Sequence, residues 1–186
     1  MVTYYTYLEL YIDDLTRRAG LNEFEKHFKK PHQTIKSRLK HLVKDKILNE
    51  KKKGRFLFYS LNKENPLLFE YLSICEKERL FKFLKKPIFN RLYNLMAAHF
   101  KNNKTLIFGS AATGKDFSDI DILILSKDKK ILKTLKDFEK TYSVKLHILQ
   151  TEQKDITQSF INEIKRKHII LNNHDYFLRL FYEDEL

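Results

Sequence analysis

The sequence predicts an α+β protein in three parts, from two periodic patterns and the apolar stretch that joins them. Residues 1–65 show three helical patterns followed by two strands. Residues 66–103 are helical and too apolar for a flexible linker, so they predict a helical bridge. Residues 104–186 alternate strands with helices, which predicts an α/β domain built on a small mixed sheet.

The first part is expected to contain three helices. Apolar residues recur at helical spacing within residues 4–18, and Gly20 ends that pattern. Asn22 and Glu25 have the spacing of a capping box at the start of a second helix, and Pro31 suits the first position of a third. The apolar side of that third helix carries Ile35, Leu39, Leu42 and Val43.

Two strands, residues 47–49 and 56–61, follow the third helix and are joined by a lysine-rich turn at Gly54. Three helices followed by a hairpin with a basic tip is the order of a winged helix-turn-helix, so residues 1–65 are expected to bind double-stranded DNA. The expected contacts, at base edges or phosphates, are Gln33, Ser37, Lys40, Lys44, Lys52, Lys53 and Arg55. The alternative is a protein-interaction or dimerisation module with a solvated lysine face.

The net charge of +12 is distributed unevenly along the chain. Residues 1–65 hold 15 Lys and Arg against 8 Asp and Glu, and residues 66–103 hold 7 against 3. Residues 104–186 are nearly balanced, with 14 against 13. A general coating of lysine would spread the excess evenly, so the distribution favours a polyanionic partner for the N-terminal half.

The composition also indicates a compartment. The single cysteine, Cys75, excludes an internal disulfide bond and fits a reducing environment. The first twenty residues lack the apolar run of a signal peptide, and no stretch is apolar enough to span a membrane. We therefore expect a soluble, cytoplasmic protein without a membrane partner.

Two motifs in the third part point to phosphate and metal chemistry. Asp119 and Asp121 are two residues apart on an expected strand, so both carboxylates leave the same face while the intervening isoleucine points into the core. Their repulsion is costly unless a cation such as Mg²⁺ or Mn²⁺ offsets it. Upstream, a strand ends in Gly109 and Ser110, where the backbone can approach a ligand and N–H and hydroxyl groups can receive phosphate oxygens.

Together, Phe108-Gly109-Ser110 and Ser118-Asp119-Ile120-Asp121 resemble the signature of the minimal nucleotidyltransferases of the DNA polymerase β superfamily. The preceding winged helix and bridge resemble prokaryotic regulators that carry such a domain. The resemblance implies that Gly109 and Ser110 hold the phosphates of a nucleoside triphosphate, and that Asp119 and Asp121 are catalytic residues that hold the metal. It implies transfer of a nucleoside monophosphate to a hydroxyl acceptor.

The sequence departs from that family pattern in three places. The loop between Ser110 and Asp119 has 8 residues, which is slightly short. Thr113 stands where many members carry Arg or Lys, although Lys115 is placed to reach the same phosphates. The strand expected at residues 144–149 offers Lys145 or His147 in place of a third carboxylate. The alternative function is therefore a non-catalytic transcription regulator or antitoxin-like protein that senses a nucleotide or binds a protein partner.

The helical bridge is expected to form a homodimer interface. It carries large apolar side chains on more than one helical face, and an exposed patch of that kind usually marks an interface. A twofold dimer would also present two recognition helices to DNA. The residues concerned are Phe69, Tyr71, Phe81, Phe83, Phe89 and Tyr93.

Overall fold

The structure, a computed structural model, describes residues 4–114 and 117–182. The chain divides into two compact units. The first unit comprises Met1–Glu78 with Tyr182–Leu186, and the second comprises Arg79–Phe181. Within the described ranges, every helix is too short or too polar to cross a membrane.

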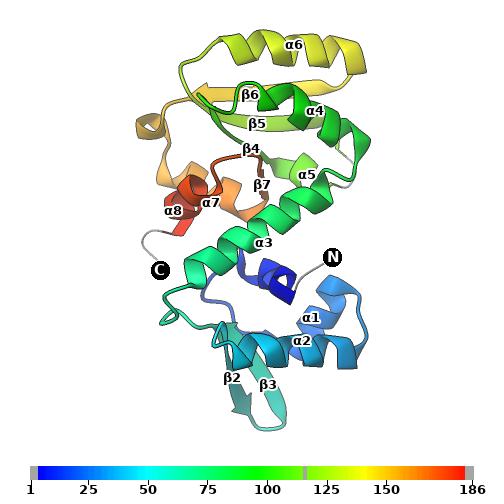
Figure 1. Cartoon of the computed structure of the whole chain (residues 1–186), viewed down its shortest axis with the longest axis vertical. Helices are drawn as coiled ribbons and strands as arrows, with labels where there is room; N and C mark the ends of the chain where they lie inside the picture. Colours follow the sequence, from blue (N-terminus) through cyan, green and yellow to red (C-terminus); the bar gives the residue numbers. More distant parts are fainter. Residues whose placement is uncertain (1–3, 115–116, 183–186) are drawn as a thin grey trace. The chain divides into compact units, whose positions relative to one another are not determined.

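The first unit contains short helices and one three-stranded sheet (Figure 1). Its elements are the 3-10 helix η1 (Tyr4–Tyr11), β1 (Ala19–Gly20), α1 (Leu21–Phe28), α2 (His32–Lys44), β2 (Leu48–Lys53), β3 (Phe56–Leu61) and the first part of α3 (Leu68–Phe83). The sheet order is β1-β3-β2, with both pairs antiparallel. Strand β1 was not expected, and β2 extends through the lysines that the sequence patterns placed in the turn.

The N-terminal helix η1 ends at Tyr11, whereas the sequence predicted a helix over residues 4–18. Hydrogen bonds within the segment that follows η1 explain the difference. The Asp14 carboxylate accepts hydrogen bonds from the backbone N–H of Thr16 at 2.8 Å and from its hydroxyl at 2.7 Å. Such side-chain bonds compete with the helical pattern and favour a turn. Helix α1 also begins earlier than expected, because the Glu23 carboxylate, and not that of Glu25, accepts the N–H of Gly20 at 2.8 Å.

Aromatic rings from η1, α1 and β3 form the centre of the first unit. The ring centroids of Tyr11 and Phe24 lie 6.1 Å apart, and those of Phe24 and Tyr59 lie 6.0 Å apart. The Tyr11 hydroxyl donates to the Tyr59 carbonyl at 2.9 Å, and burial raises the pKa of this phenol. From α2, Ile35, Leu39 and Leu42 are buried as predicted, and Val43 is half-buried.

The second unit is built on a four-stranded mixed sheet of order β6-β5-β4-β7 (Figure 1). Its strands are β4 (Lys104–Phe108), β5 (Asp119–Leu125), β6 (Lys145–Thr151) and β7 (His168–Ile170). Its helices are the end of α3, α4 (Pro87–Ala97), α5 (Gly109–Ala112), α6 (Lys130–Tyr142), η2 (Gln153–Asp155), α7 (Gln158–Arg166) and α8 (His174–Tyr182). Strand β5 pairs antiparallel with β4 and parallel with β6, so the predicted mixed sheet is confirmed.

Strand β5 separates a core face from a polar face, as the alternation of its residues predicts. Ile120, Ile122 and Ile124 are completely buried in one cluster with side chains from α4 and α6. Asp119 and Asp121 leave the opposite face and are partly exposed. The central strand therefore holds the two carboxylates on a rigid base.

The C-terminal part of this unit differs from the expected pattern. The 3-10 helix η2 precedes α7, whose first turn is capped by the Thr157 side chain, which accepts the N–H of Phe160 at 3.3 Å. The short strand β7 was not expected. Its first residue, His168, is fully buried, and Arg79 donates to its carbonyl at 2.8 Å.

The aromatic side chains of the helical bridge, on which the homodimer was predicted, are less exposed than the sequence indicated. Phe83 and Phe89 belong to the core of the second unit, with ring centroids 3.9 Å apart. Phe69, Tyr71 and Tyr93 are half-buried. Of the six, Phe81 alone is largely exposed, at 66%. The homodimer remains a prediction. Less apolar surface is exposed on these six residues than the sequence indicated, so the support for the prediction is weaker.

Candidate functional site

The polar face of β5 begins with two carboxylates that share one neighbour. Asp119 and Asp121 keep 22% and 25% of their side chains exposed. The Nδ1 atom of His147 lies 3.3 Å from Oδ2 of Asp119 and 3.4 Å from Oδ1 of Asp121. One ligand atom from each of the three residues lies within 4.8 Å of the other two. The three side chains thus form a compact cluster of potential metal ligands.

The pairing of β5 with β6 explains why the histidine joins this cluster. Asp121 is the register partner of His147, and Asp119 is the register partner of Lys145. Both residues of β6 therefore belong to the same face as the aspartates, and the sequence left both open as occupants of the third position. The geometry selects His147, which remains 49% exposed. Among the residues that the structure describes, the carboxylates in the cluster are those of Asp119 and Asp121.

Gly109 leaves the space that the Asp121 carboxylate needs. A Cβ atom added at Gly109 would lie 2.6 Å from Oδ2 of Asp121, closer than non-bonded atoms approach. The glycine also has a φ of 71°, in the left-handed region that favours glycine. Its N–H donates to the carbonyl of Lys167 at 3.1 Å, so its backbone donor is already engaged. The contribution of Gly109 to this site is therefore room for the carboxylate and not a free hydrogen-bond donor.

A cavity of about 280 Å³ opens beside Gly109. It is lined by Phe108, Gly109, Ser110, Glu163, Arg166 and Lys167. Ser110 is exposed, as are the side chains of Arg166 and Lys167 at the end of α7. The cavity thus combines a hydroxyl group with two cations and the Glu163 carboxylate. The cations exceed the anions by one, and the hydroxyl and the cations can donate to phosphate oxygens. Of the other expected phosphate-binding residues, Lys115 lies outside the described residues.

The sequence patterns did not indicate Arg166 and Lys167. They reach the cavity because β7 pairs with β4 and brings the end of α7 beside Gly109. The three-residue strand β7 is too short to show an alternating pattern. A basic pair directly after an amphipathic helix was the available signal, but nothing in the sequence linked it to the Gly109-Ser110 turn.

The polar face of α2 is exposed over its whole length. Gln33, Ser37, Lys40 and Lys44 are all exposed, as are Lys52, Lys53 and Arg55 in the hairpin. The Arg55 guanidinium lies over the ring of Phe56, 5.2 Å from its centroid. The surfaces expected to contact DNA are therefore accessible in the first unit.

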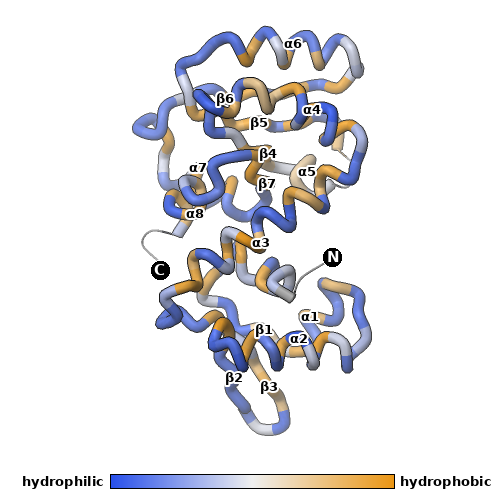
Figure 2. Tube along the Cα trace, viewed as in Figure 1, coloured by the Kyte–Doolittle hydropathy of each residue, from blue (hydrophilic) through white to orange (hydrophobic). Residues whose placement is uncertain are grey.

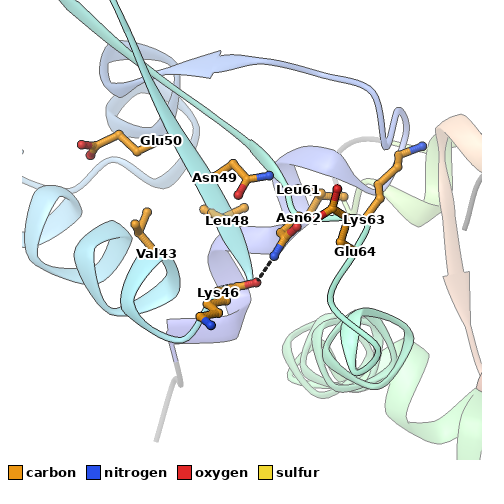
Figure 3. A pocket seen from close by; sticks show the side chains of 9 residues that line it. All are labelled: Val43, Lys46, Leu48, Asn49, Glu50, Leu61, Asn62, Lys63 and Glu64. Atoms are coloured by element: carbon orange, nitrogen blue, oxygen red, sulfur yellow. Dashed lines mark hydrogen bonds between the residues drawn. The ribbon is translucent and has the colours of Figure 1, made fainter.

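Two hollows adjoin the hairpin, and they differ in charge. The larger measures about 840 Å³ and is lined by Arg18, Asn49, Glu50, Lys51, Lys52, Lys53, Phe58, Tyr59 and Ser60. The smaller, about 730 Å³, is drawn in Figure 3; its charged residues balance, with Lys46 and Lys63 against Glu50 and Glu64. There the Asn62 amide donates to the Lys46 carbonyl at 2.8 Å, which ties the end of β3 to the loop after α2. The larger, basic hollow is the better candidate for a polyanion.

The two strands of the hairpin differ in hydropathy. Figure 2 shows β2 as hydrophilic and β3 as largely hydrophobic. In β2 every residue after Leu48 is exposed, whereas Tyr59 and Leu61 of β3 are buried. The lysines thus project from an edge strand that the core does not constrain. Lysine on an exposed edge also discourages pairing with another chain, so the charge alone does not establish DNA binding.

Comparison with known families agrees with the geometry of the second unit. Residues 90–176 match the model of the family described as Polymerase beta, Nucleotidyltransferase. The match begins in α4, includes Gly109, Asp119, Asp121 and His147, and ends in α8. The second unit therefore contains a nucleotidyltransferase-type domain. A search of curated proteins found no match to the chain.

Proposed function

We propose that the second unit binds a nucleoside triphosphate with a divalent metal and transfers a nucleoside monophosphate to a hydroxyl acceptor. The observation that carries this proposal is the convergence of Asp119, Asp121 and His147 beside Gly109. The space that Gly109 provides lets the backbone pass close to the Asp121 carboxylate. Together with the family match, this arrangement favours a shared site for metal and phosphates.

The residues of the site divide the work of this reaction. Asp119 and Asp121 would hold the metal, which when bound neutralises the negative charge of the triphosphate. The Ser110 hydroxyl and the cations of Arg166 and Lys167 would donate to phosphate oxygens and fix the orientation of the α-phosphate. The acceptor hydroxyl oxygen would then bond to the α-phosphorus, the bond from that phosphorus to the leaving pyrophosphate would break, and the hydroxyl proton would pass to solvent.

A second function, favoured by a specific observation, is nucleotide sensing without turnover. The cluster holds two carboxylates and a histidine, whereas active members of the family that the sequence resembles usually supply a third carboxylate. A third carboxylate activates the attacking hydroxyl or completes metal coordination. Without it, the domain would bind a nucleotide and signal to DNA or to a protein partner.

Label transfer distinguishes the two functions. The full chain is incubated with each of the four nucleoside triphosphates, labelled at the α-phosphate, together with Mg²⁺ or Mn²⁺ and cellular RNA, protein and small molecules. Transfer predicts label on one acceptor class, and parallel γ-labelled samples should leave that class unlabelled. Bound nucleotide with no transferred label from any of the four would support the sensor and contradict the transferase.

For the first unit, we propose double-stranded DNA binding by a winged helix-turn-helix. The proposal is supported by the exposed polar face of α2 and by the basic hollow beside the hairpin. Arg18, which precedes β1, adds a further cation to that hollow. Gln33 and Ser37 would contact base edges, and the lysines would contact phosphates. A protein partner for the same face is the alternative outcome.

Replacing Lys52 and Lys53 together by alanine should weaken DNA binding by the full chain for all sequences alike. Each phosphate that a lysine neutralises releases counterions, so the slope of log K against log salt should fall by about 0.9 for each phosphate no longer neutralised. Fluorescence anisotropy across a salt series measures both effects. Lys133→Ala with Lys136→Ala, two exposed lysines of α6, removes the same charge and should leave the slope unchanged. Equal effects of the two pairs would argue against a site in the hairpin.

A further inference from the structure

We propose that His147 is the third protein ligand of the metal site and makes that site prefer a transition-metal ion such as Mn²⁺ or Co²⁺ over Mg²⁺. The inference rests on the proposed function, because it concerns the same site. It goes beyond that function by giving His147, which stands in place of a third carboxylate, a role in the choice of metal.

The first argument is the spacing of the three ligand atoms. Neighbouring ligands of an octahedral ion, each about 2.1 Å from the metal, lie about 3.0 Å apart. The Nδ1 atom of His147 is already 3.3 Å and 3.4 Å from one oxygen of each aspartate. A shift of a few tenths of an ångström would therefore bring Nδ1 to octahedral spacing from each of these oxygens. The three ligand atoms lie within 4.8 Å of one another, and a bound ion would draw the two carboxylates together.

The second argument is that the backbone holds these atoms on one surface. Asp119 and Asp121 lie on the central strand, and the register of β6 sets His147 beside Asp121. The histidine is 49% exposed and the carboxylates 22% and 25%, so all three have access to an ion from solvent. The Gly109 backbone lies close to Asp121, so close that a Cβ at Gly109 would lie 2.6 Å from Oδ2 of that residue.

The chemistry of the donor set then determines the metal. Mg²⁺ binds oxygen ligands and keeps much of its water, whereas imidazole favours first-row transition metals. Two carboxylates with one imidazole retain the charge that any divalent ion needs. The imidazole adds a nitrogen donor, which strengthens the binding of Mn²⁺ and, to a greater extent, of Co²⁺. The site should therefore discriminate among metals through His147 alone.

The competing role for His147 is a hydrogen bond that only neutralises the aspartates. In that case removing the imidazole would change the affinity for all divalent ions by one common factor. A ligand instead changes the ratio of affinities for Mn²⁺ and Mg²⁺. Lys145→Ala is the matched control, because Lys145 is exposed on the same strand and is the register partner of Asp119. Its removal should raise the affinity for both ions alike.

The experiment measures binding of Mn²⁺ alone to the full chain by electron paramagnetic resonance, with Mg²⁺ as the competitor. His147→Ala should lower the affinity for Mn²⁺ by about tenfold or more and that for Mg²⁺ much less. His147→Asp should bring the two affinities together, since it restores an all-oxygen site. Nitrogen coupling to bound Mn²⁺ in protein labelled with ¹⁵N-histidine should be present in the wild type and absent in His147→Ala.

An unchanged ratio of Mn²⁺ to Mg²⁺ affinity in His147→Ala, or bound Mn²⁺ without nitrogen coupling in the wild type, would overturn the inference and leave the proposed function standing. Failure of the wild type to bind Mn²⁺ alone would overturn it as well. The proposed function fails separately, when the wild type shows no metal-dependent binding of a nucleoside triphosphate.

Discussion

Asp119→Asn combined with Asp121→Asn is expected to abolish metal-dependent nucleotide binding by the full chain. Both carboxylates belong to the cluster on β5, and an amide is a far weaker ligand for a divalent ion than a carboxylate. The affinity for a non-hydrolysable nucleoside triphosphate in the presence of Mg²⁺ or Mn²⁺ should fall by about 100-fold or more. Isothermal titration calorimetry, with and without the metal, measures the loss.

The same double variant should keep its fold, because removing two like charges from one strand relieves their repulsion. Its melting temperature should therefore equal or exceed that of the wild type. Asp137→Asn with Asp155→Asn removes two exposed carboxylates elsewhere in the second unit and serves as the charge-matched control. Nucleotide affinity that is equal in the two double variants would show that the site lies elsewhere.

Gly109→Ala is expected to have the second largest effect on nucleotide binding. The new Cβ would meet Oδ2 of Asp121 at 2.6 Å, and a φ of 71° disfavours any side chain. To relieve the contact, either the Asp121 carboxylate or the start of α5 must move. We expect metal-dependent nucleotide affinity to fall by about tenfold or more, since small displacements of ligand groups carry costs of this size.

Gly114→Ala separates the steric effect from the backbone effect. Gly114 has a similar φ of 65°, but a Cβ there would meet the flexible end of the Lys86 side chain, at 3.2 Å from Nζ. Both variants should lose stability, by about 1 kcal/mol from backbone strain. Nucleotide affinity, measured by the same titration, should fall much further in Gly109→Ala. Similar affinities in the two variants would contradict the assigned role of Gly109.

Residues whose placement depends on local periodicity were predictable from the sequence. The alternation of isoleucine and aspartate on β5 predicted which side chains are buried and which share the polar face. A strand expected to end in Gly109-Ser110, followed by that second strand, predicted the order of the nucleotidyltransferase-type domain, although β4 ends at Phe108 and these two residues begin α5. Amphipathic α2 likewise showed its buried and exposed faces in advance.

Residues whose placement depends on tertiary pairing were not predictable. Lys145 and His147 share one face of β6, and only the register with β5 selects the histidine. Arg166 and Lys167 line the cavity beside Gly109 and Ser110 because a three-residue strand, β7, pairs with β4. The bridge looked like an interface because periodicity cannot show that Phe83 and Phe89 are buried in the unit's own core.

Local competition explains two further differences. The carboxylate of Asp14 bonds to Thr16 and favours a turn where apolar spacing alone indicated a continued helix. Glu23 takes the capping position that the sequence suggested for Glu25, because α1 begins directly after Gly20. In both cases local hydrogen bonds to a side-chain carboxylate outweighed a weak pattern.

The most direct test of the central claim is an anomalous difference map from crystals of the full chain grown with Mn²⁺ and a non-hydrolysable nucleoside triphosphate. We predict a Mn²⁺ peak bonded to carboxylate oxygens of Asp119 and Asp121, with the triphosphate reaching the turn at Ser110. A map with the nucleotide and metal bound at another surface, and no peak at these aspartates, would contradict the account.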